Sequence, residues 1–232
     1  MKKIGLVVFL AAAVIGIVIS GFVSVGSIMG DAFHITFSRG IKGSGVMQNK
    51  SVDVGEFHAI EVGGAFQVEA VAQSDRSVEI SADDNILPLI RVNVDNGVLR
   101  IEADKGYNSS EPVRVRISAP DLDNVNASGA AVVTVRNIKN PSINIEASGA
   151  AKVTVAGETE RLDVSSSGAA KVNASELKAV KVTADASGAG AVDVFAVESL
   201  RGDASGAGRI YYAQTSAEIT QHKSGAGRIE QK

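Results

Sequence analysis

The sequence predicts an all-β protein that coils into a β-solenoid, and three observations lead to this fold class. The tripeptide Ser-Gly-Ala occurs six times, with its serines at 128, 148, 167, 187, 205 and 224, and so returns every 18 to 20 residues. A β-branched residue follows each of these serines by five positions. Aromatic residues make up only 4% of the chain, which holds 24 glycines and no tryptophan. This composition favours thin layers of Ala, Val and Ile that stack on one another.

Each repeat is expected to form a strand, a tight corner and a second strand. The β-branched residues after the corner are Val133, Val153, Val172, Val192, Ile210 and Ile229. Five positions before the serine, the later five repeats carry Ile143, Leu162, Val182, Leu200 and Ile219, whereas the first carries Asp123. Apolar residues that alternate with polar ones are typical of strands with one buried face. The pattern predicts about six coils over residues 121–232.

Glycine is expected at each corner because it reaches positive φ without a Cβ penalty. The six corner glycines are Gly129, Gly149, Gly168, Gly188, Gly206 and Gly225. The serine hydroxyls are expected to bond to neighbouring backbone groups at the turn.

Residues 51–120 are predicted to form a strand-rich cap at the N-terminal end of the coils. Residues 57–70 resemble a degenerate coil in which Gly63-Gly64-Ala65 replaces Ser-Gly-Ala. Alternating segments predict strands at 77–81, 90–94, 98–103 and 113–118. Asn96-Gly97 separates two of them and is typical of a two-residue hairpin.

The N-terminus is predicted to carry an export signal. Lys2 and Lys3 precede an uncharged apolar run from Ile4 to Gly30. Residues 1–30 are therefore predicted to form a hydrophobic helix, either a cleaved signal peptide or a retained membrane anchor, and residues 31–50 a linker. Both alternatives place the rest of the chain outside the cytoplasm: in the periplasm, at the outer membrane or on the cell surface, with or without a tether to the inner membrane.

Composition excludes several classes of protein. The chain has no cysteine, which rules out disulfides, cysteine-based zinc sites and lipoprotein attachment. Without residues 1–30 it carries 21 Lys and Arg against 26 Asp and Glu, a net charge of −5. This balance argues against a general nucleic-acid partner.

No catalytic constellation is apparent. The three histidines, His34, His58 and His222, are far apart in the sequence, and none belongs to a known catalytic motif. Gly188-Ala-Gly190 and the two later copies imitate the start of a dinucleotide fingerprint but lack its third glycine and its helix. We therefore expect neither an enzyme nor a cofactor.

Two surface features leave alternatives open. Asp83-Asp84-Asn85 could ligate calcium together with Asp95 or Asp104, but it also suits an ordinary turn, which we favour. A partial basic stripe is expected four residues after the corner serines, at Lys152, Lys171, Arg209 and Arg228. It could meet an anionic glycan or lipopolysaccharide, whereas Asp193 and Glu230 in the next column favour a solvated face of mixed charge.

Several segments in order resemble the putative auto-transporter adhesin family with a head GIN domain. They are 57–62 (Phe-His-Ala-Ile-Glu-Val), 98–101 (Val-Leu-Arg-Ile), 115–122 (Val-Arg-Ile-Ser-Ala-Pro-Asp-Leu) and the run of corners, within residues 57–229. The resemblance implies a right-handed β-helix-like fold in the periplasm or on the cell surface, and the family name suggests adhesion. It implies no particular functional residue.

These observations predict a non-catalytic bacterial envelope protein that binds or recognises a partner, such as an envelope glycan or protein. A structural or stress-related envelope component is the alternative, and a carbohydrate-active enzyme is a distant third. The last corner is followed only by Arg-Ile-Glu-Gln-Lys, which leaves an exposed strand edge. Its polar residues either blunt that edge or meet a second subunit in a homo-oligomer.

Overall fold

The computed structural model describes residues 40–73, 75–214 and 218–232. In these residues the chain is all β, as predicted, apart from one 3-10 turn at Leu87–Leu89. No helix in this part of the chain is long and apolar enough to cross a membrane. The hydrophobic helix predicted within residues 1–30 lies outside the described residues.

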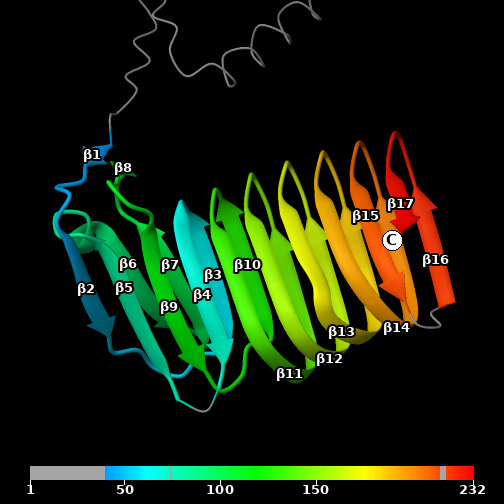
Figure 1. Ribbon diagram of the computed structural model, residues 1–232, viewed down its shortest axis with the longest axis horizontal. Helices are drawn as coiled ribbons and strands as arrows, with labels where there is room; N and C mark the ends of the chain where they lie inside the picture. Colours follow the sequence, from blue (N-terminus) through cyan, green and yellow to red (C-terminus); the bar gives the residue numbers. More distant parts are fainter. Residues whose placement is uncertain (1–39, 74, 215–217) are drawn as a thin grey trace, which may run out of the picture. The chain divides into compact units, whose positions relative to one another are not determined.

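Four long strands form the regular part of the solenoid (Figure 1). They are β11 (Val132–Ala147), β12 (Lys152–Ser166), β13 (Lys171–Ala186) and β14 (Ala191–Ala204). Neighbouring strands pair in parallel, and we call each level of this stack a rung. The register shifts near the middle of each pair, for example between Val135 and Ile138 in β11. These irregularities lie where the strands curve around the edge opposite the corners.

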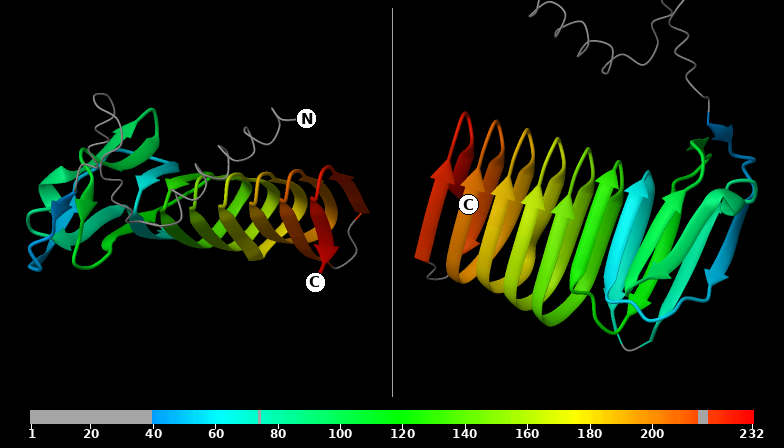
Figure 2. Two further views of the ribbon diagram at one scale, coloured as in Figure 1. Left: turned by 90° about the horizontal axis from the view of Figure 1, so that it is seen from above. Right: turned by 180° about the vertical axis from the view of Figure 1, so that it is seen from behind.

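The two halves of each long strand belong to two different faces of the coil. The first half of β14 pairs with β15 (Arg209–Gln214), whereas its second half pairs with β16 (Glu218–Lys223). We call the strands that lead into a corner the pre-corner sheet: β3 (Ala59–Gly64), β10 (Asn124–Gly129), the second halves of β11 to β14, and β16. The strands that leave a corner form the post-corner sheet: β4 (Phe66–Ala72), the first halves of β11 to β14, β15 and β17 (Arg228–Gln231). Figure 2 shows the coils stacked from above and from behind.

The solenoid has about five turns, so the predicted number of six is wrong. All six Ser-Gly-Ala corners are present. However, only the short strand β17 follows the last corner, and this coil has no second half.

The cap extends both sheets at the N-terminal end of the coils. A further rung is formed by β7 (Val98–Ala103), which pairs with β3, and β9 (Val113–Ala119), which pairs with β4. Beyond it lie the antiparallel strands β5 (Ser77–Asp83), β2 (Met47–Val52) and β6 (Ile90–Asp95). The hairpin between β6 and β7 turns at Asn96 and Gly97, both with positive φ, where the sequence predicts it. A two-stranded pair joins β1 (Ile41–Lys42) to β8 (Tyr107–Asn108).

The order of the rungs differs from the order of the sequence. The degenerate coil of β3 and β4 lies between the β7–β9 rung and the first Ser-Gly-Ala coil, because β3 pairs with both β7 and β10. After this coil, the chain forms the cap strands on one side of it and then continues with β10 on the other side. In addition, β1 and most of β2 fall within residues 31–50, where a linker is expected, so part of that segment belongs to the sheets.

The core is a stack of aliphatic side chains with one layer for each rung. Val153, Val172 and Val192 lie in register on adjacent strands and are at most 1% exposed. The pre-corner sheet buries Ile143, Leu162, Val182 and Leu200. Burial of each such side chain contributes about 1.5–3 kcal/mol, so the register is strongly specified. The apolar pattern fails only at its ends: neither Asp123 nor Gln231 is buried.

Each corner is a tight turn that needs glycine for two reasons. In the second corner, the N–H of Ala151 donates to the carbonyl of Ser148, and Gly149 has a φ of 71°. A positive φ at the first central residue alone indicates a type II′ turn, which favours glycine. Successive corners also touch, because a Cβ on Gly149 would lie 2.9 Å from the carbonyl oxygen of Gly129. The other five corner glycines have φ between 64° and 74°.

Candidate functional site

A column of basic side chains runs along the outer surface of the post-corner sheet. Lys152 pairs with Lys171, Lys171 with Ala191, Ala191 with Arg209, and Arg209 with Arg228. The four basic side chains are exposed, whereas the valine or isoleucine that follows each of them is buried. We call Lys152, Lys171, Arg209 and Arg228 the basic column.

The basic column has no carboxylate partner within the described residues. None of its four members takes part in an ion pair there. Asp193, which the sequence suggests as a neutralising charge, is instead paired with Lys232. The same ammonium group lies 4.8 Å from the centre of the Tyr211 ring. Lys232 thus neutralises the charge of Asp193, which would otherwise offset the positive charge of the column.

A second outward column runs beside the basic one on the same sheet. Its members lie two residues further along each strand than the members of the first column. They are Thr134, Thr154, Asn173, Asp193, Tyr211 and Glu230. The Asn173 side-chain oxygen accepts hydrogen bonds from the amide and the hydroxyl of Ser175. This leaves the amide nitrogen of Asn173 as a donor, next to the hydroxyls of the two threonines. We call Thr134, Thr154 and Asn173 the polar column.

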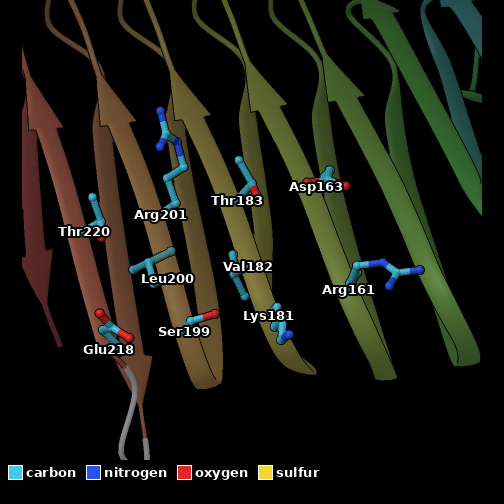
Figure 3. Close-up of a pocket in the computed structure, with 10 residues that line it drawn as sticks. All are labelled: Arg161, Asp163, Lys181, Val182, Thr183, Ser199, Leu200, Arg201, Glu218 and Thr220. Carbon is cyan, nitrogen blue, oxygen red and sulfur yellow. The ribbon is translucent and has the colours of Figure 1, made fainter.

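The pre-corner sheet carries a shallow pocket of about 390 Å³ on its outer surface (Figure 3). Three basic residues, Arg161, Lys181 and Arg201, line it together with Asp163, Glu218 and the hydroxyls of Thr183, Ser199 and Thr220. In the view of Figure 3, the guanidinium groups of Arg161 and Arg201 point away from each other. These charges do not converge on one point, as a small-molecule site would require.

Next to this pocket, the pre-corner sheet carries an acidic column that was not predicted from the sequence. Glu146, Ser165, Asp185, Asp203 and His222 follow one another in register, two residues before the corner serines. Burial raises the pKa of Asp185, with added repulsion from the carboxylates of Asp203 and Asp163 that Arg201 partly offsets. Tabulating position −2 as well as position +4 from each serine would have found the column.

The geometry of these carboxylates and histidines offers no enclosed reaction site. The acidic column lies on the outer surface of a sheet, where water reaches it. His58 bonds through Nδ1 to Asp123 Oδ1 at 2.8 Å, but no serine or threonine hydroxyl forms a hydrogen bond with that imidazole among the described residues. His222 lies on the strand beside Asp203, and His34 lies outside the described residues. In the parts of the chain that the structure describes, no three metal-ligating side chains gather into a possible metal site.

Side chains of the Asp83-Asp84-Asn85 segment form hydrogen bonds with residues 42–45, which lead into the cap, and we call this set of contacts the clamp. Asp83 is fully buried, and its carboxylate accepts four hydrogen bonds, from the Ser109 hydroxyl, the Ser110 amide and hydroxyl, and the Gly45 amide. The bonds from Ser109 and Ser110 hold the pKa of Asp83 at about 2, below its ordinary 3.8. Asn85 donates to the carbonyl of Lys42 at 2.8 Å. The favoured turn is present at 84–86, and Asp83 directs both of its oxygens to protein donors.

The C-terminal edge of the solenoid carries ammonium groups. Lys223 Nζ donates to the carbonyl of Ile229 at 3.3 Å. The backbone amide of Lys232 donates to the carbonyl of Tyr212 at 2.9 Å. Charged side chains on an edge strand disfavour pairing with another chain.

The corner serines make few contacts. Among the described residues, only Ser128 of the six donates a side-chain hydrogen bond, to the carbonyl of Val62 at 3.3 Å, so the expected bonds from the serine hydroxyls to the backbone are not found at the other five corners. The backbone instead links successive corners, for example through the Ala150 amide and the Gly129 carbonyl at 2.8 Å. A run of serines at solenoid spacing is therefore consistent with turn formation rather than with nucleophiles.

The sequence matches one family model, described as putative auto-transporter adhesin, head GIN domain, over residues 56–215. None of the curated proteins compared matches it. Among solved structures, a putative adhesin from Bacteroides fragilis is 22% identical, with a TM-score of 0.69 over 83% of this chain and 100% of that one. A putative adhesin from Parabacteroides merdae is 19% identical, with a TM-score of 0.51 over 84% of this chain and 100% of that one.

A structure described as a putative lipid binding protein, from Parabacteroides distasonis, is 16% identical, with a TM-score of 0.50 over 84% of this chain and 100% of that one. At these identities the solved structures establish a shared fold, and the function of this chain has to be argued from its own surfaces.

Proposed function

Since the chain belongs to the family described as putative auto-transporter adhesin, head GIN domain, we propose that it is a non-catalytic protein of the bacterial envelope whose coiled sheet recognises an extended partner. The adhesin descriptions of its structural neighbours agree with this proposal.

The observation that carries the proposal is the repetition of the outer surface. On the post-corner sheet, chemically similar side chains recur in register from rung to rung, at about 4.8 Å intervals. An active site needs a few groups that converge on one point, whereas a column of like groups suits a partner that repeats along its own length. Rigid stacking of the coils holds these groups in place before a partner binds, which lowers the entropic cost of association.

The N-terminal sequence supports placement in the envelope. Two lysines followed by an uncharged apolar run are typical of a signal peptide or an anchor. Under this proposal, a reporter fused after Lys232 of the full chain is active outside the cytoplasm. Activity confined to the cytoplasm would contradict the proposed location.

A glycan array tests the proposal, run with the purified full-length protein alongside a pull-down from envelope extracts. Selective retention of one glycan class supports recognition. If no glycan binds and the pull-down recovers envelope proteins instead, the chain is a structural component that contacts other proteins. If neither assay gives a partner, the proposed function is wrong.

A further inference from the structure

We propose that the post-corner sheet binds a linear acidic polysaccharide, laid along the solenoid axis over the basic column. This inference rests on the proposed function and specifies its ligand class. It identifies which of the two sheets makes contact, and through which side chains.

The spacing of the basic column suits a linear polyanion. Lys152 and Lys171 lie on consecutive rungs, as do Arg209 and Arg228, and Ala191 occupies the single rung between the two pairs. At about 4.8 Å for each rung, the column spans roughly 19 Å. An extended chain that follows it meets a cation on four of five consecutive rungs. A compact anion could contact only one pair.

The charge around the column also favours an anion. Over the two outward columns of the post-corner sheet from β12 to β17, the basic column supplies four positive charges against two negative ones, Asp193 and Glu230, and Lys232 pairs with the first of these. The whole chain, by contrast, has a net charge of −3, and the pre-corner sheet carries the acidic column. The pre-corner sheet mixes this acidic column with Arg161, Lys181 and Arg201, whereas basic residues predominate on the post-corner sheet, which is therefore the face that favours an acidic polymer.

The polar column and the scarcity of aromatic side chains beside it favour a polysaccharide over a single-stranded nucleic acid. Its hydroxyls and amide, on Thr134, Thr154 and Asn173, can exchange hydrogen bonds with sugar hydroxyls. Single-stranded nucleic acids bind largely through stacking of bases on aromatic rings. Among the described residues of the two outward columns from β11 to β17, Tyr211 is the one aromatic residue, and Lys232 already lies over its ring.

The two halves of the column have different chemistry. Arg209 and Arg228 present planar guanidinium groups that can bind a carboxylate or sulfate through two parallel hydrogen bonds. Lys152 and Lys171 present compact ammonium groups that act mainly as point charges. The arginine pair is therefore expected to contribute more to affinity for a carboxylated polymer, and the lysine pair to extend the contact along its length.

The test measures binding of polygalacturonate, a linear polymer with one carboxylate on each sugar, to the purified full-length protein. The variants are Lys152→Glu/Lys171→Glu and Arg209→Glu/Arg228→Glu. The matched control is Arg161→Glu/Lys181→Glu, which makes the same charge change on consecutive rungs of the pre-corner sheet. Unchanged melting temperatures verify that all three variants fold.

We expect each column variant to bind about tenfold more weakly or worse, and the control to change affinity by less than about threefold. Added salt should weaken binding of the unmodified protein. Equal losses in the column variants and the control would overturn the inference, because binding would then follow net charge alone. Tighter binding of a single-stranded oligonucleotide with the same pattern of losses would also overturn it.

Failure of this inference differs from failure of the proposed function. If polygalacturonate does not bind but neutral glycans on the array do, recognition stands and the basic column is not its site. If neither acidic nor neutral glycans bind, both proposals fail together.

Discussion

Val172 lies in register with Val153 on the neighbouring strand, and both side chains are buried, whereas the residue before each of them, Lys171 and Lys152, is exposed. A single step along the strand thus separates the core from the outer surface. The exposure of the basic column therefore depends on this register.

Val172→Asp should destabilise the fold by several kcal/mol, because it places an unpaired carboxylate in the aliphatic stack. Lys171→Asp should cost less than about 1 kcal/mol, because its side chain is solvated. Denaturant unfolding of the two variants measures both values. Similar losses in the two variants would mean that the register is wrong.

Gly168→Val should lower stability by more than about 1 kcal/mol. The residue has a φ of 69°, and a Cβ there would lie 2.9 Å from the carbonyl oxygen of Gly149. Gly55→Val is a suitable control, because Gly55 has no positive φ and its Cβ would meet no atom within 4 Å. Thermal unfolding compares the two, and equal melting temperatures would contradict the architectural role of the corners.

Asp83→Asn should lower the melting temperature at pH 7, because the clamp loses a carboxylate that accepts four hydrogen bonds. The folded pKa of about 2 lies below the ordinary value of 3.8. The stabilisation is therefore complete above pH 3.8 and is lost as the pH falls through 2. The difference in melting temperature between the unmodified protein and the Asp83→Asn variant should therefore disappear as the pH falls from 3.8 to 2. Asp121→Asn at an exposed site is the control, and a gap that persists below pH 2 would refute the assignment.

Asp185→Asn should raise stability at pH 7 by less than about 1 kcal/mol, because its side chain is largely solvated. Burial and the neighbouring carboxylate of Asp203 raise its pKa, so the ionised form is disfavoured in the folded state. This penalty operates above the folded pKa and disappears below the ordinary value of 3.8. Melting curves at pH 7 and pH 3 measure the effect. In an Asp203→Asn background, Asp185→Asn should raise stability by a smaller amount. An equal rise in both backgrounds would exclude repulsion between the two carboxylates as a cause.

Much of the fold can be predicted from the sequence because one local rule repeats. The spacing of Ser-Gly-Ala and of the valines after it specifies corners, strand direction and the buried face, and the structure has these features. The predicted cap strands and the turn at Asn96 and Gly97 are also present, because hairpin signals are local.

The remaining features depend on contacts between distant residues. The insertion of the β3–β4 coil between later rungs reflects pairing of β3 with both β7 and β10, which no local pattern indicates. The pairing of Lys232 with Asp193 likewise joins residues 39 positions apart. The prediction of six coils failed because a corner can be present without the strand that completes its turn. At Asp83-Asp84-Asn85 the sequence predicts a turn but not the buried hydrogen bonds of Asp83, because their donors, on Gly45, Ser109 and Ser110, are far from Asp83 in the sequence.

The claim that the protein recognises a partner without catalysis is tested most directly by measuring whether a bound glycan keeps its chain length. A glycan that the array identifies is incubated overnight with the full-length protein, recovered and analysed by mass spectrometry, while binding is measured in parallel. The predicted result is saturable binding with the chain length and bond order of the glycan unchanged. Shortened or unsaturated products that disappear in the Asp185→Asn variant would contradict it and identify the acidic column as a catalytic site.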